Sequence, residues 1–297
     1  MTVRSPDAGH AKACCAAAYD SDLVALVLGE SYHPGGAALT RRLAGHLSLA
    51  PGERVLDVAS GPGGTALLLA REHGVSVDGV DLGEKNLARA RAAAQAAGLD
   101  GRARFHPGDA ERLPFGDGVF DAVVCECAFC TFPGKQAAAA EFARVLRPGG
   151  RLGITDVTLV PGRLDERLAG LAGWVACLAD ARPLEDYEQF LAGARLRVTR
   201  AERHDGALAG MIDQIEASLR ALLIARRAAP CPGAPAALDQ VDAGVVLEMT
   251  VLAREAVSAG TLGYALLVAG KPGAGRGRPA VPPARPDLSF RRCRCSR

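Results

Sequence analysis

The sequence is poor in aromatic residues and lacks long apolar runs. Only 4% of its 297 residues are aromatic, although 49% are hydrophobic, so we expect a core of closely packed helices built from small side chains. No apolar run reaches the roughly 20 residues that a membrane-spanning helix needs. Residues 1–10 also lack the apolar stretch of a secretory signal peptide, which predicts a cytoplasmic protein without a membrane partner.

Most of the chain also lacks a large excess of one charge sign. The basic excess is concentrated from Lys271 onward, where eight basic residues stand against one acid. Because the formal net charge is +2, the preceding residues carry −5, and a mildly acidic body does not favour binding to nucleic acid. Nine cysteines in a chain without a signal peptide favour free thiols over a disulfide framework.

Strand and helix patterns alternate from residue 52 to about residue 160, which predicts a mostly parallel sheet with helices on both faces. The expected strands are residues 55–59, 75–82, 103–106, 120–127 and 151–157, with helices at 65–73, 84–97 and 135–146. Further helices are expected at 164–181, 184–192, 208–227 and 238–258, and two late strands at 196–203 and 261–268.

These patterns divide the chain into three regions. We expect residues 1–50 to form an N-terminal helical cap and residues 51–270 to form the α/β domain. Within that domain, residues 160–195 and 206–260 are expected to be helical insertions that cover the substrate. Residues 271–297 are rich in Pro, Gly and Arg and are expected to be a disordered basic tail. The sequence does not predict an oligomeric state.

A glycine-rich turn follows the first expected strand. Its residues run Asp57-Val58-Ala59-Ser60-Gly61-Pro62-Gly63-Gly64-Thr65-Ala66. Gly61 and Gly63 allow the backbone to approach a ligand that a Cβ atom would exclude. The start of the following helix offers unpaired N–H groups to an anion or a carboxylate. By itself, the Gly-x-Gly-x-x-Ala pattern also fits a nicotinamide-dinucleotide fold.

Three acidic residues near the expected strand ends narrow the choice of cofactor. Asp57 lies four residues before the glycines, Asp81 ends the second strand, and Asp109 follows the third. Over about residues 50–160 this series resembles the class I S-adenosylmethionine (SAM)-dependent methyltransferases. The resemblance implies that Asp57 reaches the amino-acid end of SAM, Asp81 binds the ribose hydroxyls, and Asp109 binds the adenine amino group. We assign three more residues to the same cofactor site: Leu82, Ala110 and Glu126.

The same resemblance implies an enzyme with a Rossmann-like fold. Its sheet would have seven strands, mostly parallel, with the last pair antiparallel. The two late strands can supply that pair. The partner would be a small molecule or a metalloid that receives the methyl group of SAM.

Cysteines suggest a particular methyl acceptor. Cys127 ends the fourth expected strand, and Cys177 lies on the helix after the fifth; residues 125 and 127 are expected to share one face. The segments around both cysteines resemble the arsenite methyltransferases, which implies that Cys127 and Cys177 bind trivalent arsenic (arsenite or methylarsenite) as substrate. Arsenic is thiophilic, as soft metals are. Two departures from that family are Ala66, where a further cysteine is common, and Glu126, which replaces an asparagine.

Two other functions are compatible with the sequence. The first is a carbon, nitrogen or oxygen methyltransferase of a small organic metabolite, similar to the ubiquinone and menaquinone C-methyltransferases. Such a site usually needs a base, so His33 or Glu126 would then be essential and the cysteines dispensable. The second is a protein that binds SAM or senses a metalloid without turnover.

Overall fold

The structure is a computed structural model that describes residues 8–29, 31–168, 180–228 and 243–273. The strands are β1 (Arg54–Val58), β2 (Ser76–Asp81), β3 (Ala103–Pro107), β4 (Phe120–Glu126), β5 (Leu146–Leu159), β6 (Arg197–Arg203) and β7 (Leu262–Gly270). The helices are α1 (Ala8–Tyr19), α2 (Asp22–Leu28), α3 (Gly36–Leu47), α4 (Gly64–His73), α5 (Glu84–Ala96), α6 (Lys135–Val145), α8 (Leu184–Gly193), α9 (Asp205–Ala228) and α10 (Ala243–Ser258). Two short 3₁₀ helices are η1 (Phe129–Thr131) and η2 (Glu166–Leu168).

The seven strands form one sheet in the order β3-β2-β1-β4-β5-β7-β6. Strands β1 to β5 pair in parallel, whereas β7 runs antiparallel to both β5 and β6. The prediction of a seven-stranded, Rossmann-like sheet with an antiparallel final pair is therefore confirmed. The strand order reverses between β1 and β4, and ligands bind at such switch points in open α/β sheets.

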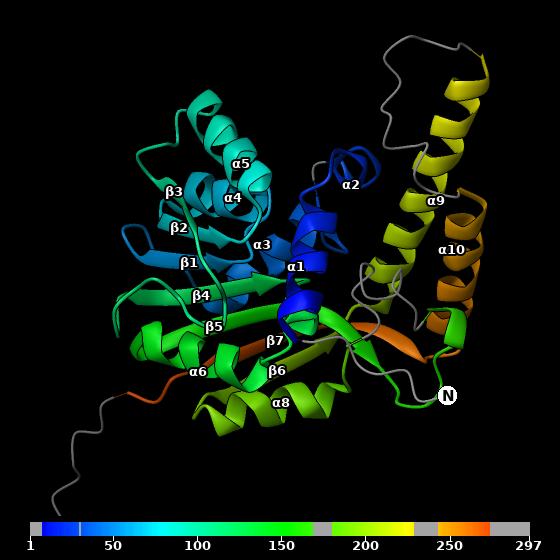
Figure 1. Ribbon diagram of the computed structural model, residues 1–297. Helices are drawn as coiled ribbons and strands as arrows, with labels where there is room; N and C mark the ends of the chain where they lie inside the picture. The colour runs from blue at the N-terminus through cyan, green and yellow to red at the C-terminus, as the bar shows by residue number, and fades with distance from the viewer. Residues whose placement is uncertain (1–7, 30, 169–179, 229–242, 274–297) are drawn as a thin grey trace, which may run out of the picture.

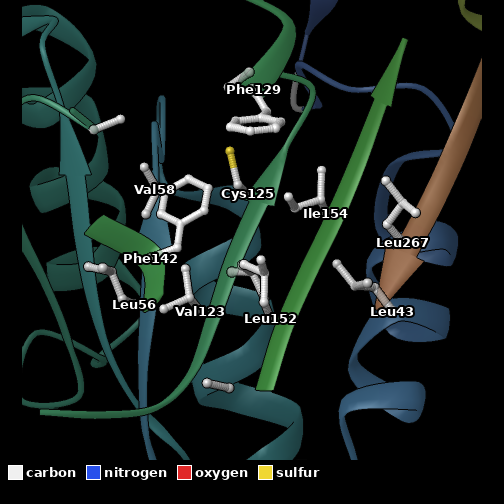
Figure 2. Packing of buried hydrophobic residues seen from close by; sticks show 14 of the residues in the cluster. Leu43, Leu56, Val58, Val123, Cys125, Phe129, Phe142, Leu152, Ile154 and Leu267 are labelled. Atoms are coloured by element: carbon white, nitrogen blue, oxygen red, sulfur yellow. The ribbon is translucent and has the colours of Figure 1, made fainter. Parts of the chain in front are cut away.

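Helices cover both faces of this sheet (Figure 1). Helices α3, α4 and α5 lie on one face, and α6 and α8 on the other, while α9 and α10 pack together at the β6–β7 end. The central strands are buried on both faces: every residue of β4 except Asp121 is buried. Such continuous burial is typical of parallel strands between two helical layers. Figure 2 shows this core, with the Cys125 sulfur pointing toward the Phe129 ring.

Several predicted boundaries differ from the structure. Strand β4 ends at Glu126 because Cys127 adopts a left-handed conformation with φ of 53°. Strand β5 begins at Leu146, where that residue pairs with Phe120, so the Pro148-Gly149-Gly150 segment lies within the strand. In the region of the expected helix at 164–181, the structure has η2, and residues 169–179 lie outside the described part. Residues 229–242 and 274–297, which include most of the expected basic tail, also lie outside it.

None of the described helices is long and apolar enough to span a membrane.

Candidate functional site

A cavity of about 1040 Å³ opens at the carboxyl ends of β1, β2 and β4. Its walls come from the glycine-rich turn, the ends of these strands, helix α1 and the 31–33 segment. Ligand pockets usually measure about 300–1,000 Å³. The cavity therefore has room for a cofactor and a second small molecule.

The two predicted glycines have different roles in the turn. Gly61 lines the cavity, and a Cβ atom there would lie 3.8 Å from the Tyr32 ring. Gly63 does not line it; a Cβ atom there would lie 2.8 Å from Phe105 and 2.9 Å from the Cβ of Ala90. Gly63 also has a φ of 87°, which favours glycine. Only Gly61 therefore matches the expectation of close approach to a ligand, whereas Gly63 allows the start of α4 to pack closely against β3 and α5.

Asp57 has an unsatisfied acceptor. The residue is 2% exposed, and its Oδ2 has no hydrogen-bond partner among the described residues, although the residue lines the cavity. Burial raises the pKa of Asp57 well above its usual range, and the charges of Glu126 and Asp81 raise it further. A buried acceptor without a donor is costly, so this oxygen suits a cationic donor such as the ammonium group of SAM.

Asp81 is held in place by the backbone. Its Oδ2 accepts from the Gly61 amide at 2.8 Å, and its Oδ1 accepts from the Gly83 amide at 2.7 Å. Burial raises the pKa of Asp81, and these two amide hydrogen bonds oppose that shift. Each carboxylate oxygen keeps a further lone pair, which can accept from a ribose hydroxyl. Leu82 follows on the cavity wall and is 45% exposed, so its side chain is free to contact a ligand.

Asp109 has a charged partner that the sequence did not suggest. The ammonium group of Lys12 lies 2.9 Å from Asp109 Oδ2 and 2.9 Å from Glu111 Oε1. The Glu111 amide also donates to Asp109 Oδ1 at 2.9 Å. Ala110 is buried between these residues and lines the cavity. Lys12 thereby holds α1 against the end of the cavity where adenine is expected.

Glu126 is the centre of a polar cluster on the cavity wall. Its Oε2 accepts from the hydroxyls of Thr40 at 2.9 Å and Thr65 at 2.7 Å. The Nε2 of His33 lies 3.6 Å from the same oxygen, and His33 Nδ1 lies 3.3 Å from the Pro34 carbonyl oxygen. The sequence had assigned Glu126 to the cofactor, and had named His33 or Glu126 as the residue needed for an organic acceptor. The structure brings the two side chains together.

The cysteines have different environments. Cys127 lines the cavity, and its amide donates to the Thr155 carbonyl oxygen at 2.6 Å. Cys125 and Cys130 are fully buried in the core and do not line the cavity, so the expectation that residues 125 and 127 share a face is wrong. The left-handed backbone at Cys127 breaks the two-residue period. Cys177 lies outside the described residues, so its expected pairing with Cys127 stays a prediction.

The described residues contain no cluster of three or more His, Cys, Asp or Glu side chains that could hold a metal ion.

Helix α1 covers the cavity with one face. Four residues of that face line the cavity at helical spacing: Lys12, Cys15, Ala16 and Tyr19. This spacing of i, i+3, i+4 and i+7 places them on one side of a helix. It is visible in the sequence, but only the folded structure indicates what that side faces.

The segment after α1 connects this helix to α5 of the α/β domain. Asp20 Oδ1 accepts from the Asn86 amide at 2.7 Å, at the start of α5. Tyr32 adds an aromatic wall, with its ring centroid 6.5 Å from that of Tyr19. The Tyr32 hydroxyl is buried and has no hydrogen-bond partner within the part of the chain that the structure describes. It is a second polar atom in the cavity that a ligand would satisfy.

The described residues fit SAM at three points. Asp57 offers an unpaired acceptor for the ammonium group, Gly61 leaves space beside the turn, and Asp81 is held at the end of β2. These are the positions that the methyltransferase resemblance implies.

Comparison with known proteins agrees with this geometry. Residues 55–150 match the methyltransferase domain family. The chain is 34% identical to the 27-O-demethylrifamycin SV methyltransferase of Amycolatopsis mediterranei over 203 residues, which cover 62% of this chain and 74% of the relative. It is 36% identical to the methyltransferase GfsG of Streptomyces halstedii over 155 residues, which cover 52% of this chain and 55% of the relative. The latter match thus spans about half of that relative's length.

Solved structures show the same fold. A candidate sarcosine dimethylglycine methyltransferase from Galdieria sulphuraria has a TM-score of 0.71 at 24% identity, and the match covers 86% of this chain and 98% of that chain. Other solved chains with this fold, at 20% identity, hold SAM or S-adenosylhomocysteine. These matches support the broader family and do not single out the arsenite methyltransferases. The chain belongs to the class I SAM-dependent methyltransferase family.

Proposed function

We propose that this protein transfers the methyl group of SAM to a hydroxyl oxygen of a small organic acceptor. The observation that carries the proposal is the contact between His33 and Glu126 on the wall of the cofactor cavity, at 3.6 Å. The proposal narrows the predicted alternative of a carbon, nitrogen or oxygen methyltransferase to oxygen. The name of the rifamycin relative, which acts on a 27-O-demethyl compound, supports an oxygen acceptor.

His33 is placed to accept a proton. SAM, when bound, supplies an electrophilic methyl group on a sulfonium sulfur. A hydroxyl oxygen that bonds to this carbon must lose its proton, and a neutral imidazole is a suitable acceptor near pH 7. If Nδ1–H faces the Pro34 carbonyl oxygen, Nε2 carries the acceptor lone pair, and its neighbours among the described residues are Thr40 Oγ1 at 3.3 Å and Glu126 Oε2 at 3.6 Å. Once protonated, Nε2 forms an ion pair with Glu126, which Thr40 and Thr65 hold in position.

Trivalent arsenic is the second candidate acceptor. The observation that favours it is that Cys127 lines the same cavity. It would need a second thiolate, for which the sequence suggested Cys177. Arsenic is itself the nucleophile, so this reaction would not require His33.

We expect His33→Ala to lower kcat for an organic hydroxyl acceptor by about 10²- to 10⁴-fold, the usual contribution of a general base. The assay would measure S-adenosylhomocysteine formed from SAM with 27-O-demethylrifamycin SV or 2-naphthol as acceptor. His73→Ala is a matched control because His73 lies at the end of α4 and does not line the cavity. Glu126→Gln should reproduce part of the loss, since it removes the charge opposite Nε2.

The same assay separates the other functions. Product formation that requires arsenite, that survives His33→Ala and that is lost in Cys127→Ser would support the arsenic acceptor and contradict the proposal. Methylation at carbon would support the quinone-type alternative. SAM binding without S-adenosylhomocysteine formation across acceptors would support a protein that binds the cofactor without turnover.

A further inference from the structure

We infer that Tyr264 is a positioning residue for the methyl transfer. Acting through Thr155, its hydroxyl holds Glu126 in the orientation that the proposed ion pair with His33 needs. Neither Tyr264 nor Thr155 is among the described residues that line the cavity, so both act from behind its wall. The inference rests on the proposed function, in which Glu126 pairs with His33. We call the contacts that join Tyr264, Thr155 and Glu126 the hydrogen-bond chain.

The hydrogen-bond chain crosses three neighbouring strands, β7, β5 and β4. The Tyr264 hydroxyl on β7 donates to Thr155 Oγ1 on β5 at 3.0 Å. The Thr155 hydroxyl in turn donates to Glu126 Oε1 on β4 at 3.4 Å. Thr155 and Glu126 are direct partners in the parallel pairing of β5 with β4. The sheet, rather than a loop, therefore places all three side chains.

Tyr264 determines where the Thr155 proton points. A threonine hydroxyl has one proton, so it can donate to one acceptor at a time. Its oxygen accepts from Tyr264, which leaves the proton for Glu126. Burial raises the pKa of Tyr264 well above its usual range, so the phenol keeps its proton and remains the donor. Replacement of Tyr264 by phenylalanine would leave the Thr155 hydroxyl free to rotate away from Glu126.

The Thr155 hydroxyl completes the donor set of a buried carboxylate. Glu126 is 9% exposed, and its Oε2 accepts from Thr40 at 2.9 Å and Thr65 at 2.7 Å. Within the described part of the chain, Thr155 is the one side chain that donates to the other oxygen, Oε1. A buried acceptor that loses its donor is costly, so the carboxylate would turn toward other donors. Because His33 Nε2 lies 3.6 Å from Oε2, such a turn would alter the contact between these two side chains.

A second buried tyrosine provides a matched control. Tyr187 is as fully buried as Tyr264, and its hydroxyl donates to the Val157 carbonyl oxygen at 3.0 Å. The same hydroxyl accepts from the Arg182 amide at 3.1 Å. Tyr187→Phe therefore removes the same phenolic oxygen from the core but leaves the hydrogen-bond chain intact.

The ring nitrogens of His33 report on the hydrogen-bond chain without turnover. The protein with isotope-labelled histidine would be saturated with S-adenosylhomocysteine and studied by NMR, and the His33 signals would be identified by their loss in His33→Ala. We expect Tyr264→Phe and Thr155→Val to shift these signals. Tyr187→Phe should leave them at the wild-type positions. Thr155→Ser keeps the hydroxyl and should restore most of the wild-type spectrum.

The same spectra can overturn the inference. Unchanged His33 signals in folded Tyr264→Phe or in folded Thr155→Val would do so, and so would an equal shift in Tyr187→Phe. Thermal unfolding shows which variants fold. If Tyr264→Phe does not fold, the comparison of Thr155→Val with Thr155→Ser still tests the link to Glu126.

The turnover assay gives a second readout. We expect Tyr264→Phe and Thr155→Val each to lower kcat for the hydroxyl acceptor by about 10-fold, since each weakens a hydrogen bond to a charged group. KM for SAM should stay within about 2-fold, because neither residue lines the cavity. A higher KM with an unchanged kcat would indicate weaker cofactor binding and would contradict the positioning role.

The two readouts separate this inference from the proposed function. If the His33 signals respond as expected but no hydroxyl compound is methylated, the proposed function fails and the link from Tyr264 to Glu126 stands. If His33→Ala abolishes methylation while the His33 signals do not respond to Tyr264→Phe, the proposed function stands and the inference fails.

Discussion

Gly63→Ala is expected to destabilise the protein by about 2–5 kcal/mol and to weaken SAM binding by 10-fold or more. The left-handed backbone at this position disfavours any side chain, and the added Cβ atom would lie 2.9 Å from Ala90 on α5. Neither α4 nor α5 can move without displacing the turn. That turn carries the Gly61 amide, which donates to Asp81 at 2.8 Å. Thermal unfolding and calorimetric titration of SAM would measure both effects.

Gly98→Ala separates backbone strain from packing. Gly98 also has a positive φ, 64°, but no atom lies within 4 Å of the position where its Cβ would be. The strain is partly offset by the lower entropy of the unfolded chain, so we expect a change within about 1 kcal/mol. SAM affinity should not change. Equal destabilisation by the two substitutions would contradict the packing role of Gly63.

Asp57→Asn is expected to weaken SAM binding by about 10- to 100-fold while it stabilises the free protein. The first effect follows because the hydrogen bond between the ammonium group of SAM and the Asp57 carboxylate would lose the charge of the carboxylate. The second follows because burial makes ionised Asp57 costly in the absence of a ligand. For a chain of this size each kcal/mol gained raises the Tm by about 2–4 °C. Wild-type SAM affinity in the variant would contradict the role of Asp57.

The raised pKa of Asp57 also predicts opposite pH dependences for stability and binding. The folded protein retains a proton that the unfolded chain releases near pH 4, so the stability of the free protein falls as pH rises toward the raised pKa. SAM affinity should rise over the same range, since the ammonium group needs an ionised partner. Unfolding curves with and without SAM across pH would show the two trends, and Asp57→Asn should flatten both.

The cofactor half of the site was predictable from local sequence. Asp57, Asp81 and Asp109 each stand at or just after a strand end, and the carboxyl ends of parallel strands meet at one edge of the sheet. The glycine spacing identified the turn. The separate packing role of Gly63 was not visible, because it depends on Ala90 and Phe105, which are 27 and 42 residues away in the chain.

The side-chain contacts that close the cavity were less predictable because distant segments build them. Lys12 reaches Asp109 across 97 positions, and Thr40 reaches Glu126 across 86. No spacing rule in the sequence joins such residues. The prediction that residues 125 and 127 share one face failed for a local reason. The left-handed backbone at Cys127 interrupts the two-residue alternation of the strand, so the Cys127 side chain lines the cavity while Cys125 stays in the core. The role of Cys177 stays a prediction.

A crystal structure of the protein with S-adenosylhomocysteine tests the central claim most directly. The account predicts that the ligand lies in the cavity at the ends of β1, β2 and β4, with its amino group hydrogen-bonded to Asp57 Oδ2 and its ribose hydroxyls on Asp81. The adenine would lie beside Asp109, under α1. A ligand bound elsewhere, or an amino group out of hydrogen-bonding reach of Asp57, would contradict it.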